Sequence, residues 1–305
     1  MKNILSLLIS FFIISLVVYY QKPITSFVLQ EFIYKKELAE YQTNNYSKAS
    51  DYEYVKLTDD FYPKNEEDIK NALYTILDSG MTNFSLFCSN EYESCLNDVE
   101  KISTDYNILS HINNLVHPYN SYDRLYITTN TFGKINITVE KLYSSEEINE
   151  INKNIERIKS EIIKENMSTR DKIKAFHDYV INNTKYDKER SEELKNSIST
   201  NNIKQSNKAN GVLKNHIALC SGYTDLMAIF LSDIGVPNYK ISNEDHIWNA
   251  VYLDNNWYHL DLTWDDPVVE PDEDLLIYDF FLITTQELEN LDTYEHNYDK
   301  TVYGF

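Results

Sequence analysis

The sequence predicts an α+β protein, and three observations support this prediction. Residues 221–234 carry apolar side chains at helical spacing, and Gly235 and Pro237 follow them, which is typical of a helix C-terminus. Residues 246–253 and 257–262 alternate as strands on either side of turn-forming residues, which predicts an antiparallel hairpin. Further helical and strand patterns lie upstream, so we expect a helix packed on an antiparallel sheet, preceded by a smaller α+β domain.

The first element is an apolar run from residue 4 to residue 20, interrupted only by serines. Its length is near the lower limit for a membrane-spanning helix. No small-x-small cleavage motif follows it, so we expect residues 1–24 to be an uncleaved, single-pass membrane anchor. A short N-terminus usually stays inside the cell, which would place the rest of the chain outside. The alternative is a cleaved signal peptide and a secreted protein.

The next two regions are a spacer and an accessory domain. Residues 25–51 have an amphipathic helical pattern and then a polar stretch, which predicts a stalk and linker. Residues 52–143 predict a small α+β domain without a catalytic constellation. Its elements are a helix from Asn65 to about Asp78, a strand at 84–88, a helix within 92–109, and a hairpin formed by 124–129 and 134–143.

Residues 144–305 form the predicted catalytic domain. Helical spacing predicts helices over 145–166 and 169–182, and Ser145 with the two glutamates after it is expected to cap the first. Residues 188–209 are polar and lack periodicity, so they are either a loop that covers the site or a disordered insertion. After the hairpin we expect a last strand at 278–283 and a short helix at 285–291. The acidic stretch at 265–274 could bind calcium, but its spacing matches no EF-hand, and a solvated loop is favoured.

Cys220 stands at the predicted N-terminus of the helix over residues 221–234. Unpaired backbone N–H groups and the helix dipole favour a thiolate there, and the thiolate is the nucleophilic form. A buried structural cysteine is the alternative interpretation.

His246 begins the first strand of the hairpin, and Asp261 lies in the second. A turn at Asn255 and Asn256 would place Asp261 opposite Ala250, on the same face as His246 but four residues away from it. The shared face supports a His–Asp pair, and the register stays open. His177 is a rival catalytic base, but it lies in a helix and lacks this strand context.

These three residues suit acyl transfer. Cys220 would attack a carboxamide carbonyl, His246 would pair with the thiolate and protonate the leaving amine, and Asp261 would orient the imidazole. The Cys220 backbone N–H would supply one oxyanion donor. Candidates for the second donor are Trp248, Tyr223 and His216, although packing or loop roles are also open for them.

Three segments together resemble the transglutaminase-like superfamily in its bacterial extracellular form: KIKAFHDYVINNTKYD, GVLKNHIALCSGY and HIWNAVYLDNNWYHLDLTWDDP. They span about residues 173–267 in the family's order Cys, His, Asp. The resemblance implies a papain-like α+β fold and a Cys220–His246–Asp261 triad. It also implies a crosslinking, deamidating, proteolytic or amidase activity, although some members have lost catalysis. One departure is Asn215–His216, where the family often has glycine.

Composition narrows the possible partners and compartments. The net charge of −20, from 28 basic and 48 acidic residues, argues against nucleic-acid binding. Cys88 and Cys95 could close a small loop as a disulfide or remain two reduced thiols, and Cys220 is left over. No further residues complete a four-ligand metal site with Cys88 and Cys95.

The sequence therefore predicts a membrane-anchored, externally facing cysteine enzyme that acts on protein or peptide amide bonds, with hydrolysis favoured over crosslinking. The substrate could be a cell-envelope peptide. No cofactor or metal is expected; a metal site at His246, His259 and Asp261 lacks a ligand-spacing motif. The alternative is a catalytically silent module that binds cell-envelope or protein partners.

Overall fold

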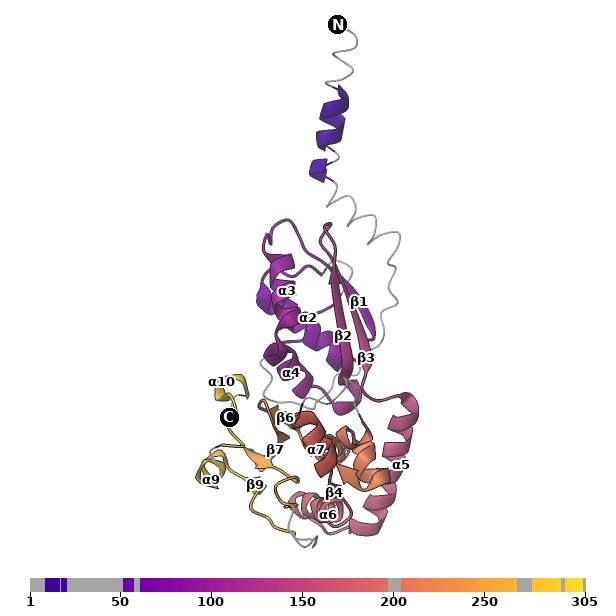
Figure 1. Ribbon diagram of the computed structural model, residues 1–305, viewed down its shortest axis with the longest axis vertical. Helices are drawn as coiled ribbons and strands as arrows, with labels where there is room; N and C mark the ends of the chain where they lie inside the picture. The colour runs from indigo at the N-terminus through magenta and orange to yellow at the C-terminus, as the bar shows by residue number, and fades with distance from the viewer. Residues whose placement is uncertain are drawn as a thin grey trace. The chain divides into compact units, whose positions relative to one another are not determined.

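The computed structural model describes residues 9–16, 18–20, 52–57, 61–196, 204–267, 276–291 and 294–303 (Figure 1). The chain divides into two compact units. Unit 1 contains Tyr52–Tyr106 and Arg124–Glu140, and unit 2 contains Asn107–Asp123 and Lys141–Phe305. The segment 107–123 thus groups with unit 2, and the predicted domain boundaries at residues 51/52 and 143/144 stay predictions.

In its described part from residue 61 onward, unit 1 combines helices α2 and α3 with a three-stranded sheet. The strand order is β1 (Asn83–Phe87), β3 (Lys134–Lys141), β2 (Tyr122–Thr129), with β1 antiparallel to β3. Helix α2 (Glu66–Asp78) begins where the Asn65 side chain accepts a hydrogen bond from the Asp68 N–H, as expected. It packs against α3 (Cys95–Thr104).

The predicted helix within residues 92–109 is two helices. Helix α3 ends at Thr104, because Asp105 has an extended backbone with φ −89° and ψ 101°. Helix α4 (Tyr106–Asn114) follows and belongs almost entirely to unit 2.

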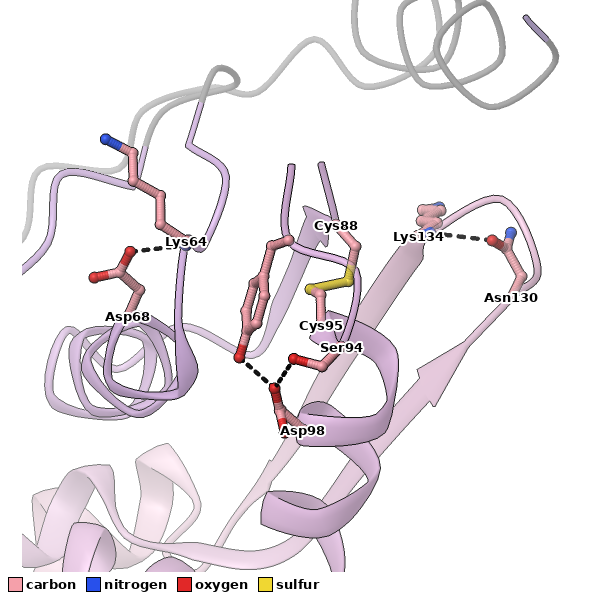
Figure 2. The surroundings of a disulfide bond; sticks show 9 residues. Lys64, Asp68, Cys88, Ser94, Cys95, Asp98, Asn130 and Lys134 are labelled. Carbon is pink, nitrogen blue, oxygen red and sulfur yellow. Dashed lines mark hydrogen bonds between the residues drawn. A yellow bond between two sulfur atoms is a disulfide. The ribbon is translucent and has the colours of Figure 1, made fainter. Parts of the chain in front are cut away.

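Cys88 and Cys95 form a disulfide (Figure 2). It joins the chain just after β1 to the first residue of α3. Beside it, the Asp98 carboxylate accepts hydrogen bonds from the hydroxyls of Tyr92 and Ser94 at 2.6 and 2.7 Å. Of the two alternatives that the sequence left open, the structure shows the bonded pair.

Unit 2 contains a four-stranded antiparallel sheet with strands β6 (Asn238–Ser242), β7 (Ile247–Leu253), β8 (Asn256–Leu260) and β9 (Phe281–Ile283) in sequential order. Helix α8 (Cys220–Asp233) packs on β6 and β7. This arrangement confirms the predicted helix on an antiparallel sheet.

Two further helices complete the core of unit 2. Helix α5 (Ser145–Ile162) contacts α6 (Thr169–Asn182), and α6 contacts α8 through the stacked rings of Phe176 and Phe230, 3.8 Å apart. The cap of α5 is Ser144 rather than Ser145, because Ser144 and Glu147 bond each other's backbone N–H groups. Unit 2 also contains η2 (Pro118–Asn120), α9 (Thr285–Leu291) and α10 (Lys300–Tyr303).

A buried ion pair fixes α8 to the sheet. The Lys240 Nζ of β6 lies 2.9 Å from Asp225 Oδ1 of α8, and Tyr143 donates its hydroxyl to Asp225 Oδ2 at 2.8 Å. Each charge of the pair therefore has a partner, which a buried charge requires.

The segment before α8 is more ordered than its polarity predicts. Residues 188–195 form helix α7 (Lys188–Lys195), which begins where the Asp187 side chain accepts the Arg190 N–H. This overturns the interpretation of 188–209 as irregular throughout. Then follow η3 (Gln205–Asn207), the π-helical turn η4 (Gly211–Asn215), and a parallel pair formed by β4 (Lys185–Tyr186) and β5 (Ile217–Ala218).

The turn of the β7–β8 hairpin sets the register of the site. Asp254 and Asn255 have positive φ values of 50° and 66°, so they are the two turn residues, one position earlier than expected. Ala250 therefore pairs with His259 rather than with Asp261. Continuing this register by one pair places Asp261 opposite Trp248, two residues from His246 instead of four.

The predicted N-terminal membrane helix is not supported. Residues 9–16 and 18–20 are helical and exposed, but no helix in the described part of the chain is long and apolar enough to cross a bilayer. The predicted stalk over residues 25–51 and most of the acidic stretch, residues 268–275, lie outside the described residues.

Candidate active site

Cys220 is the first residue of α8 and carries a free, partly exposed thiol. The backbone of η3 lies against this first turn: Leu219 donates its N–H to Ser206 O at 2.8 Å. A side chain at Gly222 would place its Cβ 2.7 Å from the same carbonyl oxygen, so the approach requires glycine. Because Cys220 is the first residue of α8, it lies at the positive end of the helix dipole, which favours negative charge there.

Two hydrogen bonds hold α8 against β7 near His246. The Thr224 hydroxyl, one turn after Cys220, donates to Ile247 O at 2.9 Å, and Asn249 Nδ2 donates to Thr224 O at 3.0 Å. Ile247 directly follows His246, and the charge of Cys220 acts on the His246 imidazole, so the thiol lies near that ring.

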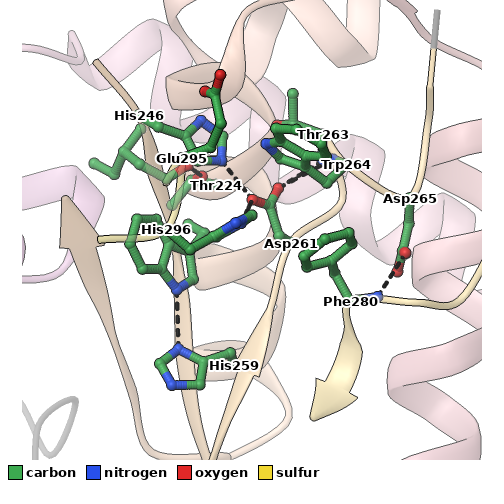
Figure 3. Close-up of polar contacts among 12 residues, drawn as sticks. Thr224, His246, His259, Asp261, Thr263, Trp264, Asp265, Phe280, Glu295 and His296 are labelled. Carbon is green, nitrogen blue, oxygen red and sulfur yellow. Dashed lines mark hydrogen bonds and ion pairs between the residues drawn. The ribbon is translucent and has the colours of Figure 1, made fainter. Parts of the chain in front are cut away.

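His246 and Asp261 form a buried pair (Figure 3). The Nε2 atom of His246 is hydrogen-bonded to Asp261 Oδ2. Asp261 Oδ1 accepts the backbone N–H groups of Thr263 and Trp264 at 2.9 and 3.3 Å, in the turn that follows β8. The fold brings the His246–Asp261 pair close to the first turn of α8, where Cys220 lies.

The electrostatics of the pair favour a charged imidazole. Burial alone would lower the pKa of His246, but the charge and hydrogen bond of Asp261, with a smaller contribution from Cys220, raise it to about 10. Burial alone would raise the pKa of Asp261, but His246 and His296 hold it well below its usual range. An imidazole that is charged at neutral pH can protonate a leaving amine.

His296 is a site residue that the sequence interpretation missed. It lies in the segment 294–303 and is fully buried, with its Nε2 2.8 Å from Asp261 Oδ2 (Figure 3). Its surroundings in the sequence are polar and aperiodic, so no motif marks it. Only the folded chain brings it to the carboxylate.

Residues 156–262 match the family model of the transglutaminase-like superfamily, and this segment contains Cys220, His246 and Asp261 but not His296. The chain contains a transglutaminase-like domain. Kyphoscoliosis peptidase from Mus musculus is 26% identical over 147 residues, which are 43% of this chain. They are 21% of that peptidase, so the chain spans about a fifth of the length of this relative.

Two solved structures resemble part of the chain. A transglutaminase (TGase) crystal structure has a TM-score of 0.34 and 22% identity, covering 47% of this chain and 44% of the other. A candidate cysteine protease from Cytophaga hutchinsonii has a TM-score of 0.27 and 13% identity, covering 46% of this chain and 61% of the other.

The three side chains considered for the second oxyanion donor have their polar hydrogens or ring nitrogens engaged elsewhere. Trp248 donates its indole N–H to His259 at 3.0 Å, and Tyr223 donates its hydroxyl to Asp266 at 2.6 Å. His216 Nδ1 lies 2.7 Å from Asn183 O.

His216 explains the departure from the family pattern. Its φ of 54° and ψ of 31° lie in the left-handed region that glycine adopts most easily, and histidine is among the side chains that tolerate it. The loop before the nucleophile therefore keeps a glycine-like backbone without glycine.

Tyr186 is a second residue that the sequence interpretation missed. It ends β4 and pairs with Ala218 of β5, two residues before Cys220. Its hydroxyl donates to Ser191 Oγ at 3.4 Å. Burial raises the pKa of Tyr186, and the charge of Cys220 adds to this effect, which puts the phenol in the neighbourhood of the thiol.

His177, the rival base, belongs to a separate cluster. Its Nδ1 lies 3.1 Å from Asp178 Oδ1 and its Nε2 lies 3.0 Å from Asp265 Oδ2. Both ring nitrogens thus face carboxylates, and no thiol lies among these partners.

The candidate metal ligands in the structure differ from those considered in the sequence, because His296 takes the place of His259. His259 faces Trp248 through Nδ1 and Thr285 through Nε2, so it does not join His246 and Asp261. Within the described residues, ligand atoms of His246, Asp261 and His296 lie within 4.8 Å of one another. Both imidazoles already donate to the same carboxylate oxygen, so a metal ion would compete with that hydrogen-bonded arrangement. The expectation that the site needs no metal stays a prediction.

Proposed function

We propose that the transglutaminase-like domain is a cysteine-dependent acyl-transfer enzyme that cleaves amide bonds of proteins or peptides. The observation that carries this proposal is the buried His246 imidazole, which is hydrogen-bonded to Asp261 and lies near Cys220 at the N-terminus of α8. Cys220 is the nucleophile, His246 the acid and base, and Asp261 the group that orients the imidazole.

The reaction would proceed in two steps, acylation of Cys220 and hydrolysis of the resulting thioester. The Cys220 thiolate attacks the amide carbonyl carbon, and the tetrahedral intermediate collapses with cleavage of the C–N bond. His246 gives its proton to the leaving amine, and an acyl thioester remains on Cys220. Water then attacks the thioester while His246 accepts a proton from it. The carboxylic acid leaves, and the thiolate–imidazolium pair is restored.

Hydrolysis is favoured because water is a sufficient acceptor and no amine-binding site was recognised in the sequence. An amine acceptor would give crosslinking through the same thioester. For location, we propose a membrane-anchored enzyme whose catalytic part faces outward. Support comes from the apolar run at residues 4–20 and from the Cys88–Cys95 disulfide, since disulfides persist mainly in oxidising compartments. Secretion after signal cleavage is the alternative.

The proposal is tested by trapping the acyl-enzyme. The full chain is incubated with a library of peptide amides, with and without a fluorescent primary amine. It is then digested, and the fragment that contains Cys220 is analysed by mass spectrometry. We expect an acyl adduct on Cys220 and a released amine, without fluorescent product. Cys220→Ala should yield neither product.

Fluorescent peptide products that require Cys220 would replace hydrolysis by transamidation. Absence of any adduct or turnover across the library would instead favour the silent binding module, and a partner pull-down with the full chain would follow.

A further inference from the structure

The Asp261 carboxylate has every acceptor position filled. Its Oδ1 accepts two backbone N–H groups, from Thr263 and Trp264, and its Oδ2 faces the Nε2 atoms of both His246 and His296. A carboxylate offers about four lone-pair sites, so the group has little freedom to rotate. His296 supplies one of the two side-chain contacts in this set.

One asparagine connects His296 to His246. Asn243 follows β6, and its Nδ2 donates to the backbone carbonyls of Glu295 and Asn297, which flank His296, at 2.7 and 3.1 Å. Its Oδ1 accepts the backbone N–H of His246 at 2.8 Å. The Asn243 amide thus ties the loop that carries one imidazole to the segment that carries the other.

The same segment is fastened a second time beyond His296. Tyr239 of β6 donates its hydroxyl to Tyr303 O at 2.6 Å, and the Tyr303 hydroxyl accepts Asn114 Nδ2 at 2.8 Å. The segment 294–303 is therefore held on β6 at both ends of the stretch that delivers His296.

The His296 ring lies among aromatic side chains. It stacks on Phe280 with ring centroids 4.8 Å apart and an interplanar angle of 19°. It contacts the edges or faces of Trp248 and Trp264 at 4.9 and 5.5 Å. An apolar ring of similar size could occupy this place, so packing alone does not explain a polar imidazole there.

We propose that His296 is a positioning residue of the site: its Nε2–H donates to Asp261 Oδ2, fixes the carboxylate plane, and so holds His246 in line with Cys220. Both the Nε2–H tautomer and the imidazolium carry this donor, so the role is independent of the charge of His296. The segment 294–303, which lies beyond the matched family segment, thereby becomes part of the active site. This inference rests on the proposed function.

Several titratable or charged groups near the site can influence how the rate of Cys220 alkylation depends on pH. The titratable or charged groups whose charges act on the site are Cys220 on α8, Tyr186 on β4, Asp261 and Asp265 after β8, His259 on β8, and His296 and Lys300 in the last described segment. The variants below change only His296 or the asparagine that holds it.

The experiment measures the rate of Cys220 alkylation by iodoacetamide from pH 5 to pH 9.5 in the full chain. His296→Phe keeps the ring volume and removes the donor, whereas His296→Gln keeps a donor at the position of Nε2. At pH 6 we expect the Phe variant to react roughly tenfold more slowly than the wild type. Its profile should shift toward that of a free cysteine, whose pKa is about 8.5. The Gln variant should retain most of the wild-type rate.

A second variant tests the delivery of His296. Asn243→Asp keeps the acceptor for the His246 N–H but replaces the donor to the Glu295 and Asn297 carbonyls, so it should resemble His296→Phe in direction with a smaller effect. All rates should converge at pH 9.5, because a thiol is ionised there without help. If His296→Phe does not fold, the Asn243→Asp variant tests the positioning role of His296 in its place.

The outcomes separate the two claims. A wild-type profile for His296→Phe, or equal losses in the Phe and Gln variants, would overturn the positioning role while leaving the enzyme proposal intact. A wild-type chain that reacts only like a free thiol would remove the proposed function, and this inference would fall with it.

Discussion

Unit 2 contains two buried histidine–carboxylate clusters that look alike in composition but differ in their third partner. In one, His246 is hydrogen-bonded to Asp261, and the charge of the nearby Cys220 also acts on the ring. In the other, His177 lies between two carboxylates, Asp178 at 3.1 Å and Asp265 at 3.0 Å. The pKa of both histidines is raised, because carboxylates outweigh the opposing effect of burial.

The carboxylates respond in opposite directions. Burial raises the pKa of Asp265 despite its bond to His177, whereas the two imidazoles around Asp261 hold its pKa well below the usual range. Asp265 also accepts the Phe280 N–H at 2.9 Å, which ties the turn after β8 to the approach to β9 (Figure 3). A buried His–Asp pair therefore does not by itself distinguish the two clusters; the nearby Cys220 thiol does.

The largest expected effect separates the two histidines. His246→Gln should reduce peptide-amide hydrolysis by on the order of 10⁴-fold, because it removes the group that donates and accepts the proton. His177→Gln should change the rate less than about threefold while lowering the melting temperature, since its loss removes the imidazole partner of the buried Asp265 carboxylate. Steady-state kinetics with calorimetry on both variants checks this. Equal activity losses would break the comparison.

The two aspartates should differ in the same way, with a smaller effect. Asp261→Asn should cost about 10²-fold in rate, because an amide still fills the space but no longer stabilises the imidazolium. Asp265→Asn should leave the rate near wild type and lower the melting temperature by roughly 3–6 °C, which corresponds to about 1–2 kcal/mol. An Asp265→Asn variant as inactive as Asp261→Asn contradicts the assignment.

The pH dependence of stability gives the next effect. The pKa of His246 rises from an ordinary 6.5 to about 10 on folding, so its stabilisation is complete below pH 6.5 and is lost as the pH rises toward 10. The melting temperature of the wild type should exceed that of His246→Gln by roughly 5 °C at pH 6, and this difference should shrink steadily by pH 10. A difference that grows over this range would reverse the sign and contradict the ion pair.

The smallest expected effect concerns the number of cysteines that react with iodoacetamide in the native chain. Native iodoacetamide labelling without reductant should modify Cys220 alone, because Cys88 and Cys95 are joined in unit 1. Intact mass spectrometry should show one added label, and three after unfolding and reduction. More than one label on the native, unreduced chain would show that the Cys88–Cys95 bond is absent.

Local patterns predicted the elements that build the site. Apolar spacing with Gly235 and Pro237 predicted helix α8 to within about a residue, and strand alternation predicted β7 and β8. The Asn65 cap and the boundaries of α6 followed from equally local signals. Each of these depends on neighbours in the sequence, so the sequence is sufficient.

The features that the sequence did not reveal depend on distant contacts or on a turn choice. The hairpin register depends on whether Asp254 or Asn255 begins the turn, and both are good turn formers. His296 reaches Asp261 only because Asn243 and Tyr239 hold its segment on β6. Tyr186 approaches Cys220 through a parallel pair, which no local periodicity marks.

The central claim is that Cys220 and His246 form an assembled thiolate–imidazolium pair, and the most direct measurement is the alkylation rate of Cys220 in the wild type and in His246→Gln at pH 6. A free cysteine with a pKa of about 8.5 is ionised to only about 0.3% there. We predict wild-type alkylation roughly 100-fold or more faster than in His246→Gln, with His177→Gln indistinguishable from the wild type. Equal rates in the wild type and His246→Gln would contradict the account.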